Sequence, residues 1–131
     1  MTHCLDAWAV LEWLHGDEPA RTRVLALLER ERPVMSWINL GEVAYTLERR
    51  AGAKRATEVV ARLRGRLALD LPTPDRVLEA AAVKARHRLS YADAFAVATA
   101  LAHDAVLVTG DPEILTGDTA CRVEDVRRRA P

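Results

Sequence analysis

The stretch LSYADAFAVATALAHDAVLVTGDPEI (residues 89–114) predicts a helix followed by a strand. Ser90 belongs to the residue types that commonly cap a helix N-terminus, and the alanine-rich segment behind it predicts a buried helix. The run from Ala105 to Val108 is apolar and β-prone, and the turn sequence TGDP ends it at residues 109–112. A continuous apolar run is typical of a strand covered on both faces, as in a parallel sheet.

The rest of the chain repeats this alternation. A short run from Thr2 to Leu5 ends at Asp6, and a dense apolar segment follows it, which predicts another strand and helix. Weaker strand predictions are residues 33–35, 67–71 and 121–123. Further helices are predicted over residues 20–31, 36–50, 53–64 and 74–88. Strands that alternate with helices over short connections predict an α/β fold with a mainly parallel sheet and helices on both faces.

Length and composition limit the class of protein. The chain has 131 residues, which fits one domain over residues 1–131. Its 19 lysines and arginines balance 19 aspartates and glutamates, which disfavours a protein that coats nucleic acid by bulk charge. The chain has no long apolar span and no basic N-terminal region, so we expect a cytoplasmic protein that does not act at a membrane. Cys4 and Cys121 lack metal-pair spacing, and we expect two buried, reduced thiols.

Two aspartates directly follow predicted strands. Asp6 and Asp111 would lie at the carboxyl ends of their strands, where ligands gather in open parallel sheets. Each residue also has a purely structural interpretation. Asp6 fits the N-cap of the next helix, and Asp111 is a common turn residue in TGDP.

Two further acids lie on predicted helices. Ser90-Tyr-Ala-Asp93 matches a capping box, which would explain the position of Asp93 without any chemistry. Glu42 lies about 200° around its helix from Leu40, so periodicity alone predicts a solvated side chain.

Convergence of these acids in the fold would have a chemical consequence. Two carboxylates about 5 Å apart repel by roughly 3 kcal/mol at an effective dielectric constant near 20. A divalent cation would remove that repulsion, and Mg²⁺ prefers carboxylate oxygens together with water and phosphate. Sequence spacing leaves open both this convergence and the separate structural roles.

Four segments carry motifs of a known family. They are CLDAWAVLEWL (residues 4–14), SWINLGEVAYTLERR (36–50), LSYADAFAVATA (89–100) and AVLVTGDPEI (105–114). In order and interval the chain resembles the PIN-domain family, specifically its VapC-type toxin ribonucleases, over roughly residues 2–125. The last two motifs are the specific ones. The resemblance implies a three-layer α/β/α sandwich with a central, mainly parallel sheet of about five strands.

The resemblance also implies an active site. It assigns an acidic quartet that holds Mg²⁺ or Mn²⁺ to Asp6, Glu42, Asp93 and Asp111. Supporting roles are implied for Ser90, Thr109 and Glu113. Many relatives carry a serine or threonine one or two places after the first aspartate, whereas this chain has Ala7 and Trp8. A hydroxyl contact near Asp6 is therefore expected to be missing.

By the same resemblance the protein is a Mg²⁺-dependent endoribonuclease toxin that leaves 5′-phosphate and 3′-hydroxyl ends. Its substrate would be transfer RNA or another structured RNA. Family members usually form homodimers and are neutralised by a VapB-type antitoxin whose tail enters the active-site groove. The candidates for steering RNA phosphates are Arg49, Arg50, Arg86 and Arg88. Arg49 shares the helix face of Glu42 and is the best of them.

Two other classes of protein remain open. One is a catalytically silent protein that keeps the fold and acts only through its antitoxin partner. The other is a receiver-like Mg²⁺-binding regulatory domain, which needs an acid pair near the end of the first strand and a late lysine. This chain has only Asp6 at that strand end and no lysine after Lys84.

Overall fold

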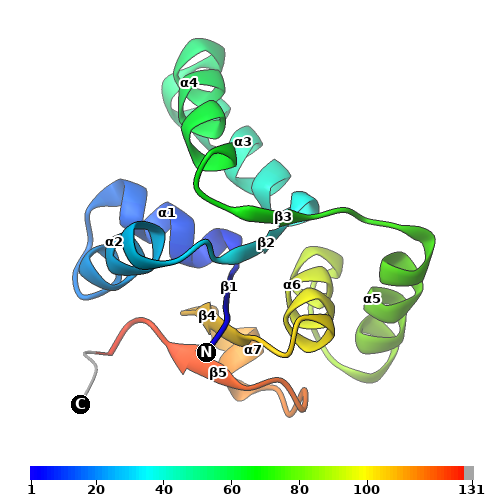
Figure 1. Cartoon of the computed structure of the whole chain (residues 1–131). Helices are drawn as coiled ribbons and strands as arrows, with labels where there is room; N and C mark the ends of the chain where they lie inside the picture. The colour runs from blue at the N-terminus through cyan, green and yellow to red at the C-terminus, as the bar shows by residue number, and fades with distance from the viewer. Residues whose placement is uncertain (129–131) are drawn as a thin grey trace.

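A five-stranded parallel sheet forms the centre of the protein (Figure 1). The structure is a computed structural model and describes residues 1–128. The strands are β1 (His3–Leu5), β2 (Val34–Ser36), β3 (Ala68–Asp70), β4 (Val106–Thr109) and β5 (Val123–Asp125). Their order is β3-β2-β1-β4-β5, and each neighbouring pair is parallel. The predicted α/β fold with a parallel sheet is confirmed.

Helices connect the strands. They are α1 (Ala7–His15), α2 (Ala20–Arg30), α3 (Trp37–Ala51), α4 (Ala53–Arg64), α5 (Pro74–Arg86), α6 (Tyr91–Ala102) and α7 (Pro112–Thr116). The helices predicted from periodicity are confirmed, whereas α7 had been interpreted only as a turn. Within residues 1–128, no helix combines the length and the apolar character needed to cross a membrane.

Alternating side chains of the strands separate two hydrophobic layers. Leu5 and Met35 pack with residues of α1 to α4 on one face of the sheet. Cys4 and Val34 pack with residues of α6 and α7 on the other face. In Figure 1, α1 and α2 lie on one side of the strands, and α5 and α6 lie on the other. This arrangement confirms the three-layer sandwich. Cys4 is buried and Cys121 is half-buried, and both are free thiols.

The last strand lies further along the chain than predicted. Residues 121–123 were expected, but β5 runs from Val123 to Asp125 and pairs Val123 with Leu107 of β4. The charged residue Glu124 lies within this strand and accepts a hydrogen bond from Arg23 of α2 at 2.7 Å. An edge strand that contains two acids does not give the apolar pattern on which the prediction depended.

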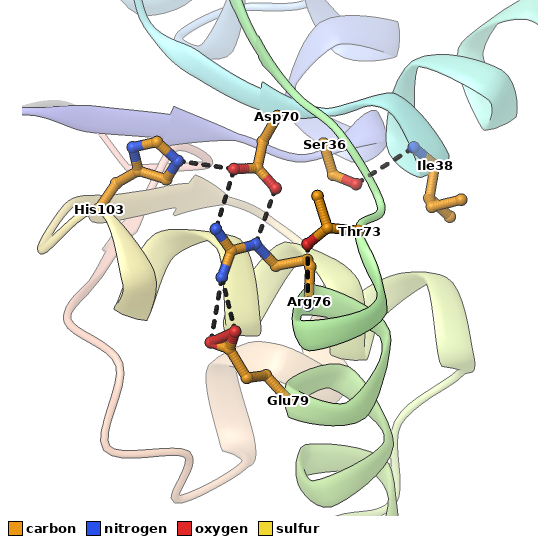
Figure 2. A network of polar contacts seen from close by, with 7 residues as sticks. All are labelled: Ser36, Ile38, Asp70, Thr73, Arg76, Glu79 and His103. Atoms are coloured by element: carbon orange, nitrogen blue, oxygen red, sulfur yellow. Dashed lines mark hydrogen bonds and ion pairs between the residues drawn. The ribbon is translucent and has the colours of Figure 1, made fainter.

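A polar network fixes α5 and α6 to the end of β3, as Figure 2 shows. Asp70 accepts two hydrogen bonds from the guanidinium of Arg76, at 2.8 and 3.1 Å, and contacts Nε2 of His103 at 2.8 Å. Arg76 also contacts Glu79, and Thr73 caps α5 by accepting the backbone N–H of Arg76. Because His103 follows α6 directly, the network anchors the C-terminal end of the helix that carries Asp93.

Candidate active site

Asp6 links the end of β1 to the start of α1. As the N-cap of α1 it accepts the backbone N–H of Ala9 at 2.9 Å, as its structural interpretation predicted. Its other carboxylate oxygen accepts a hydrogen bond from the Thr109 hydroxyl. The residue is 2% exposed. Burial raises the pKa of Asp6 to about 7, although the two hydrogen bonds act in the opposite direction.

Thr109 joins two of the predicted acids. Its hydroxyl donates to Asp6 and accepts the backbone N–H of Asp111 at 3.0 Å. Thr109 is fully buried at the end of β4, so this bridge is shielded from water. The hydroxyl contact that was expected to be missing near Asp6 is therefore supplied from another strand.

Asp93 lies in the first turn of α6. Ser90 caps this helix by accepting the backbone N–H of Asp93 at 3.1 Å, which is the Ser90 half of the predicted capping box. The carboxylate is directed to other acids as well. Burial raises the pKa of Asp93 to about 7, and the negative charges of Asp111 and Glu42 add to the increase. Every residue of α6 from Asp93 to Ala100 is buried, so the helix is a rigid mount for this side chain.

Glu42 is half-buried, so the periodicity-based expectation of a solvated side chain is wrong. The cause is Asn39, a fully buried residue of α3 that the sequence analysis did not identify. Its amide nitrogen donates to Glu42 at 2.9 Å and to the carbonyl of Ala92 at 3.0 Å, which joins α3 to the start of α6. Burial raises the pKa of Glu42, the Asn39 bond lowers it, and the charge of Asp111 raises it further.

Three carboxylates come close enough together to share a cation. Asp93, Asp111 and Glu113 each offer an oxygen, and these oxygens lie within 4.8 Å of one another. Glu113 follows Asp111 at the start of α7, where its backbone N–H donates to Asp111 at 2.9 Å. Asp6 and Glu42 are outside this spacing. Burial is the largest cause of the raised pKa values of Asp6 and Glu42, and the negative charges of neighbouring site acids raise them further.

A second group of possible ligands lies at the end of α1. Glu12, His15 and Asp17 meet the same spacing, but His15 and Asp17 are exposed. The sequence analysis did not identify this group. Exposed acids commonly gather without binding an ion, so the group with the buried Asp93 is the stronger candidate for a metal site.

The predicted arginines have different surroundings. Arg88 lines a hollow of about 390 Å³ together with Glu113, one of the three close carboxylates. The guanidinium of Arg49 lies over the ring of Tyr45, 5.0 Å from the ring centroid, on the helix that carries Glu42.

The other two arginines contact groups outside the acidic cluster. Arg50 contacts Nε2 of His15 at 2.6 Å, which directs it toward the end of α1. Arg86 donates to the carbonyl of Ala82 at 2.9 Å, within its own helix. The structure therefore places Arg88 in a hollow with Glu113, whereas Arg50 and Arg86 contact other groups.

A separate groove lies among α1, α2 and α4. Its volume is about 920 Å³, and none of the predicted acids lines it. Its apolar lining comes from Trp13, Leu14, Leu25, Val59 and Leu63. The basic residues that line it are Arg21, Arg55, Arg62 and Arg66.

The comparisons with known proteins agree with this fold. The PIN domain family model matches residues 3–116. VapBC2 from Rickettsia felis, bound to a promoter DNA fragment, aligns with a TM-score of 0.74 and 15% identity over 95% of this chain and 98% of that one. VapBC-1 from nontypeable Haemophilus influenzae aligns with a TM-score of 0.73 and 21% identity over 98% of this chain and 100% of that one. VapC20 from Mycobacterium tuberculosis, a Sarcin-Ricin loop cleaving toxin, aligns with a TM-score of 0.71 and 21% identity over 90% of this chain and 96% of that one. At these identities the structures share the fold alone. No curated protein matches the sequence.

Proposed function

Because the chain belongs to the PIN-domain family, we propose that it is a metal-dependent endoribonuclease and the toxin of a VapBC-type toxin–antitoxin pair. The observation that carries this proposal is the group of carboxylate oxygens from Asp93, Asp111 and Glu113 within 4.8 Å of one another. The VapBC complexes among the similar structures support the toxin assignment.

The donor set fits a hard divalent cation. All three groups offer carboxylate oxygen, a ligand that Mg²⁺ and Mn²⁺ prefer over softer ligands such as thiolate. The raised pKa values of Asp6 and Asp93 reflect buried negative charge that a cation would offset. When bound, such a cation supplies Lewis acidity toward a water molecule and toward the phosphoryl oxygens of the substrate.

The residues of the chain would divide the remaining tasks. Asp93 and Asp111 hold the cation, and Glu113 adds an outer ligand. Asp6 and Thr109 orient Asp111 through the shared hydroxyl, since Thr109 bonds to both. Asn39 holds Glu42 in place on the neighbouring helix, so Glu42 adds negative charge on the side of Asp111. The quartet of Asp6, Glu42, Asp93 and Asp111 thereby acts as one unit.

The reaction is hydrolysis of an RNA phosphodiester. The oxygen of a water molecule forms a bond to phosphorus, the bond from phosphorus to the 3′-oxygen breaks, and the leaving oxygen takes up a proton. The products are a 5′-phosphate and a 3′-hydroxyl. Arg88 would bind a neighbouring RNA phosphate, because it lines a hollow that also contains the site residue Glu113.

The experiment uses wild-type protein freed of any partner. Total RNA and a panel of transfer RNAs are incubated with Mg²⁺, with Mn²⁺ or with EDTA, and the cut ends are mapped. The proposal expects discrete 5′-phosphate ends that disappear with EDTA. Cleavage that persists in EDTA would contradict it, because it indicates a mechanism without a metal. Cyclic phosphate ends would also contradict it, because they indicate attack by the 2′-hydroxyl of the RNA instead of water.

Two alternatives were open from the sequence. Membership of the PIN-domain family excludes the interpretation as a receiver-like regulatory domain. A catalytically silent PIN protein stays as the second candidate, and the same cleavage experiment separates it from a nuclease. A folded protein that cuts none of the RNAs favours the silent protein.

An antitoxin would regulate the enzyme by binding both a surface groove and the acidic site. The groove among α1, α2 and α4 combines an apolar lining with four arginines, which suits an amphipathic segment with acidic residues. We propose that a VapB-type antitoxin occupies it and reaches the acids with its tail. Co-purification from cells that express both genes, followed by loss of the complex in Arg62→Glu, tests this assignment.

A homodimer is the assembly that we propose for the toxin. Leu78 of α5 is 68% exposed, and Leu71, which precedes this helix, is 63% exposed. Two large apolar side chains on or near α5 are therefore in contact with water. Burial against a second copy would remove them from solvent. Light scattering of wild type and Leu78→Glu tests the assembly, with a monomeric variant expected. We propose that the enzyme acts in the cytoplasm, where its RNA substrates lie.

A further inference from the structure

Both exposed aromatic side chains lie within three residues of a site acid in the sequence. The sequence has three tryptophans, two tyrosines and one phenylalanine, and all lie within the described residues. The tryptophans pack against the hydrophobic core, and Phe95 is 4% exposed. Only the two tyrosines are exposed among them, Tyr45 at 51% and Tyr91 at 44%. Tyr45 follows Glu42 by three residues, and Tyr91 precedes Asp93 by two.

Tyr45 stands one helical turn from a site acid. Residues three apart on a helix have their Cβ atoms roughly 5–6 Å from one another. The axial rise from Glu42 to Tyr45 is about 4.5 Å, and Arg49 lies about 6 Å further along the same side of α3. These residues therefore form a column that leads away from the acids along the surface of α3.

The ring of Tyr45 is also held in place. The guanidinium carbon of Arg49 lies 5.0 Å from the ring centroid, a geometry in which the cation attracts the face of the ring. Tyr91 has a different environment, because its ring rests against Phe95 with centroids 5.1 Å apart. An exposed aromatic ring on the protein surface gains no burial of its own, whereas a nucleic-acid base stacks on such a ring readily.

We propose that Tyr45 is a positioning residue that stacks one unpaired base of the RNA beside the cleaved phosphodiester. Arg49 supports the ring and attracts the phosphate of the same nucleotide. The inference rests on the proposed ribonuclease function and adds to it a residue that positions the substrate. Stacking needs a base with a free face, and in a duplex the neighbouring base pairs cover both faces. Tyr45 can therefore stack only on a nucleotide that is unpaired.

The test measures binding separately from cleavage. Asp93→Asn serves as the parent protein because it should bind RNA without cutting it. A short single-stranded RNA that contains 2-aminopurine is titrated with the parent and with Tyr45→Leu and Tyr45→Phe in that background. Stacking on Tyr45 quenches the fluorescence of 2-aminopurine at one position of the RNA. We expect Tyr45→Leu to lose this quenching and weaken binding about 5- to 100-fold, and Tyr45→Phe to retain both.

Several results would overturn the inference. Equal binding by the parent, the leucine variant and the phenylalanine variant removes the stacking role, while cleavage by wild type leaves the proposed function intact. If Tyr45→Leu weakens the binding of single-stranded and of fully paired RNA equally, Tyr45 does not stack on an unpaired base. A change of molecular mass in Tyr45→Leu assigns the residue to an interface between copies. A parent that binds no RNA overturns the inference directly, and wild-type cleavage decides the function separately.

Discussion

The ring of Trp8 occupies the space into which a side chain at Gly110 would project. A Cβ atom on Gly110 would meet ring carbons of Trp8 at 2.3 Å, far inside van der Waals contact. Gly110 lies between Thr109 and Asp111, so this packing fixes the backbone that carries both residues. Trp8, which stands where many relatives have a hydroxyl residue after Asp6, thus helps to position Thr109 and Asp111.

Gly110→Ala is expected to destabilise the protein by about 1–3 kcal/mol, because either the Trp8 ring or the turn must shift. Urea unfolding measures the change. The matched control is Gly41→Ala, since a Cβ at this exposed helical position meets nothing within 4 Å. The control should be stabilised by roughly 0.5–1 kcal/mol. Equal stability of wild type and Gly110→Ala would contradict the packing argument.

Thr109→Val should also reduce the free energy of unfolding, by about 1–3 kcal/mol, because it removes a buried hydroxyl and keeps the shape. The change leaves an oxygen of Asp6 and the N–H of Asp111 without their partner. It also removes a hydrogen bond that lowers the pKa of Asp6, so this pKa should rise. Thr109→Ser restores the hydroxyl and should recover most of the stability. A valine variant as stable as wild type would contradict the role of the hydroxyl.

Much of this architecture was predictable from local sequence patterns. The position of Asp6 and Asp111 was predictable because each follows a buried strand, and the carboxyl ends of parallel strands share one edge of the sheet. Glu42 was misjudged because the periodicity of a single helix contains no information about its neighbours. The contact from Asn39 to the carbonyl of Ala92 brings α6 against this side of α3. Two residues more than fifty positions apart create that environment, and no local pattern contains it.

Divalent cations should stabilise the folded protein at the acids. A ligand that binds only the native state adds about 2.7 kcal/mol at 100 times its dissociation constant, so Mn²⁺ should raise the melting temperature by several degrees. Asp111→Asn should lose most of this shift, since Asp111 contributes to the group of close carboxylates. His15→Gln is the control, because it disrupts only the second group at the end of α1. Loss of the shift in His15→Gln alone would place the cation there instead.

The network around Asp70 predicts a dependence of stability on pH. Burial alone would raise the pKa of Asp70, but the hydrogen bonds and charges of Arg76 and His103 outweigh it and hold the pKa below its ordinary value. The unfolded state, with a pKa of about 3.9, therefore takes up a proton before the folded state does as the pH falls. The stabilisation is fully present above roughly pH 5 and is lost as the pH falls through the native pKa.

Asp70→Asn should therefore cost about 1–3 kcal/mol at pH 7, and the difference from wild type should shrink below about pH 4. Unfolding curves across this range measure it. The control Glu79→Gln removes a more exposed partner of Arg76 and should change stability by less than about 0.5 kcal/mol. A difference between Asp70→Asn and wild type that stays constant from pH 7 to pH 3 would contradict the ionic origin of the effect.

The most direct test of the central claim compares cleavage rates of wild type, Asp93→Asn and Asp75→Asn on a mapped RNA substrate with Mg²⁺. Both aspartates lie in the first turn of a capped helix, but Asp75 is exposed and belongs to neither group of close carboxylates. We expect Asp93→Asn to stay folded and to cut at least about 100-fold more slowly, since the loss of even an outer residue of a metal site costs roughly 10–100-fold. We expect an unchanged rate for Asp75→Asn. A folded Asp93→Asn that cuts at the wild-type rate would contradict the assignment of these acids as the catalytic centre.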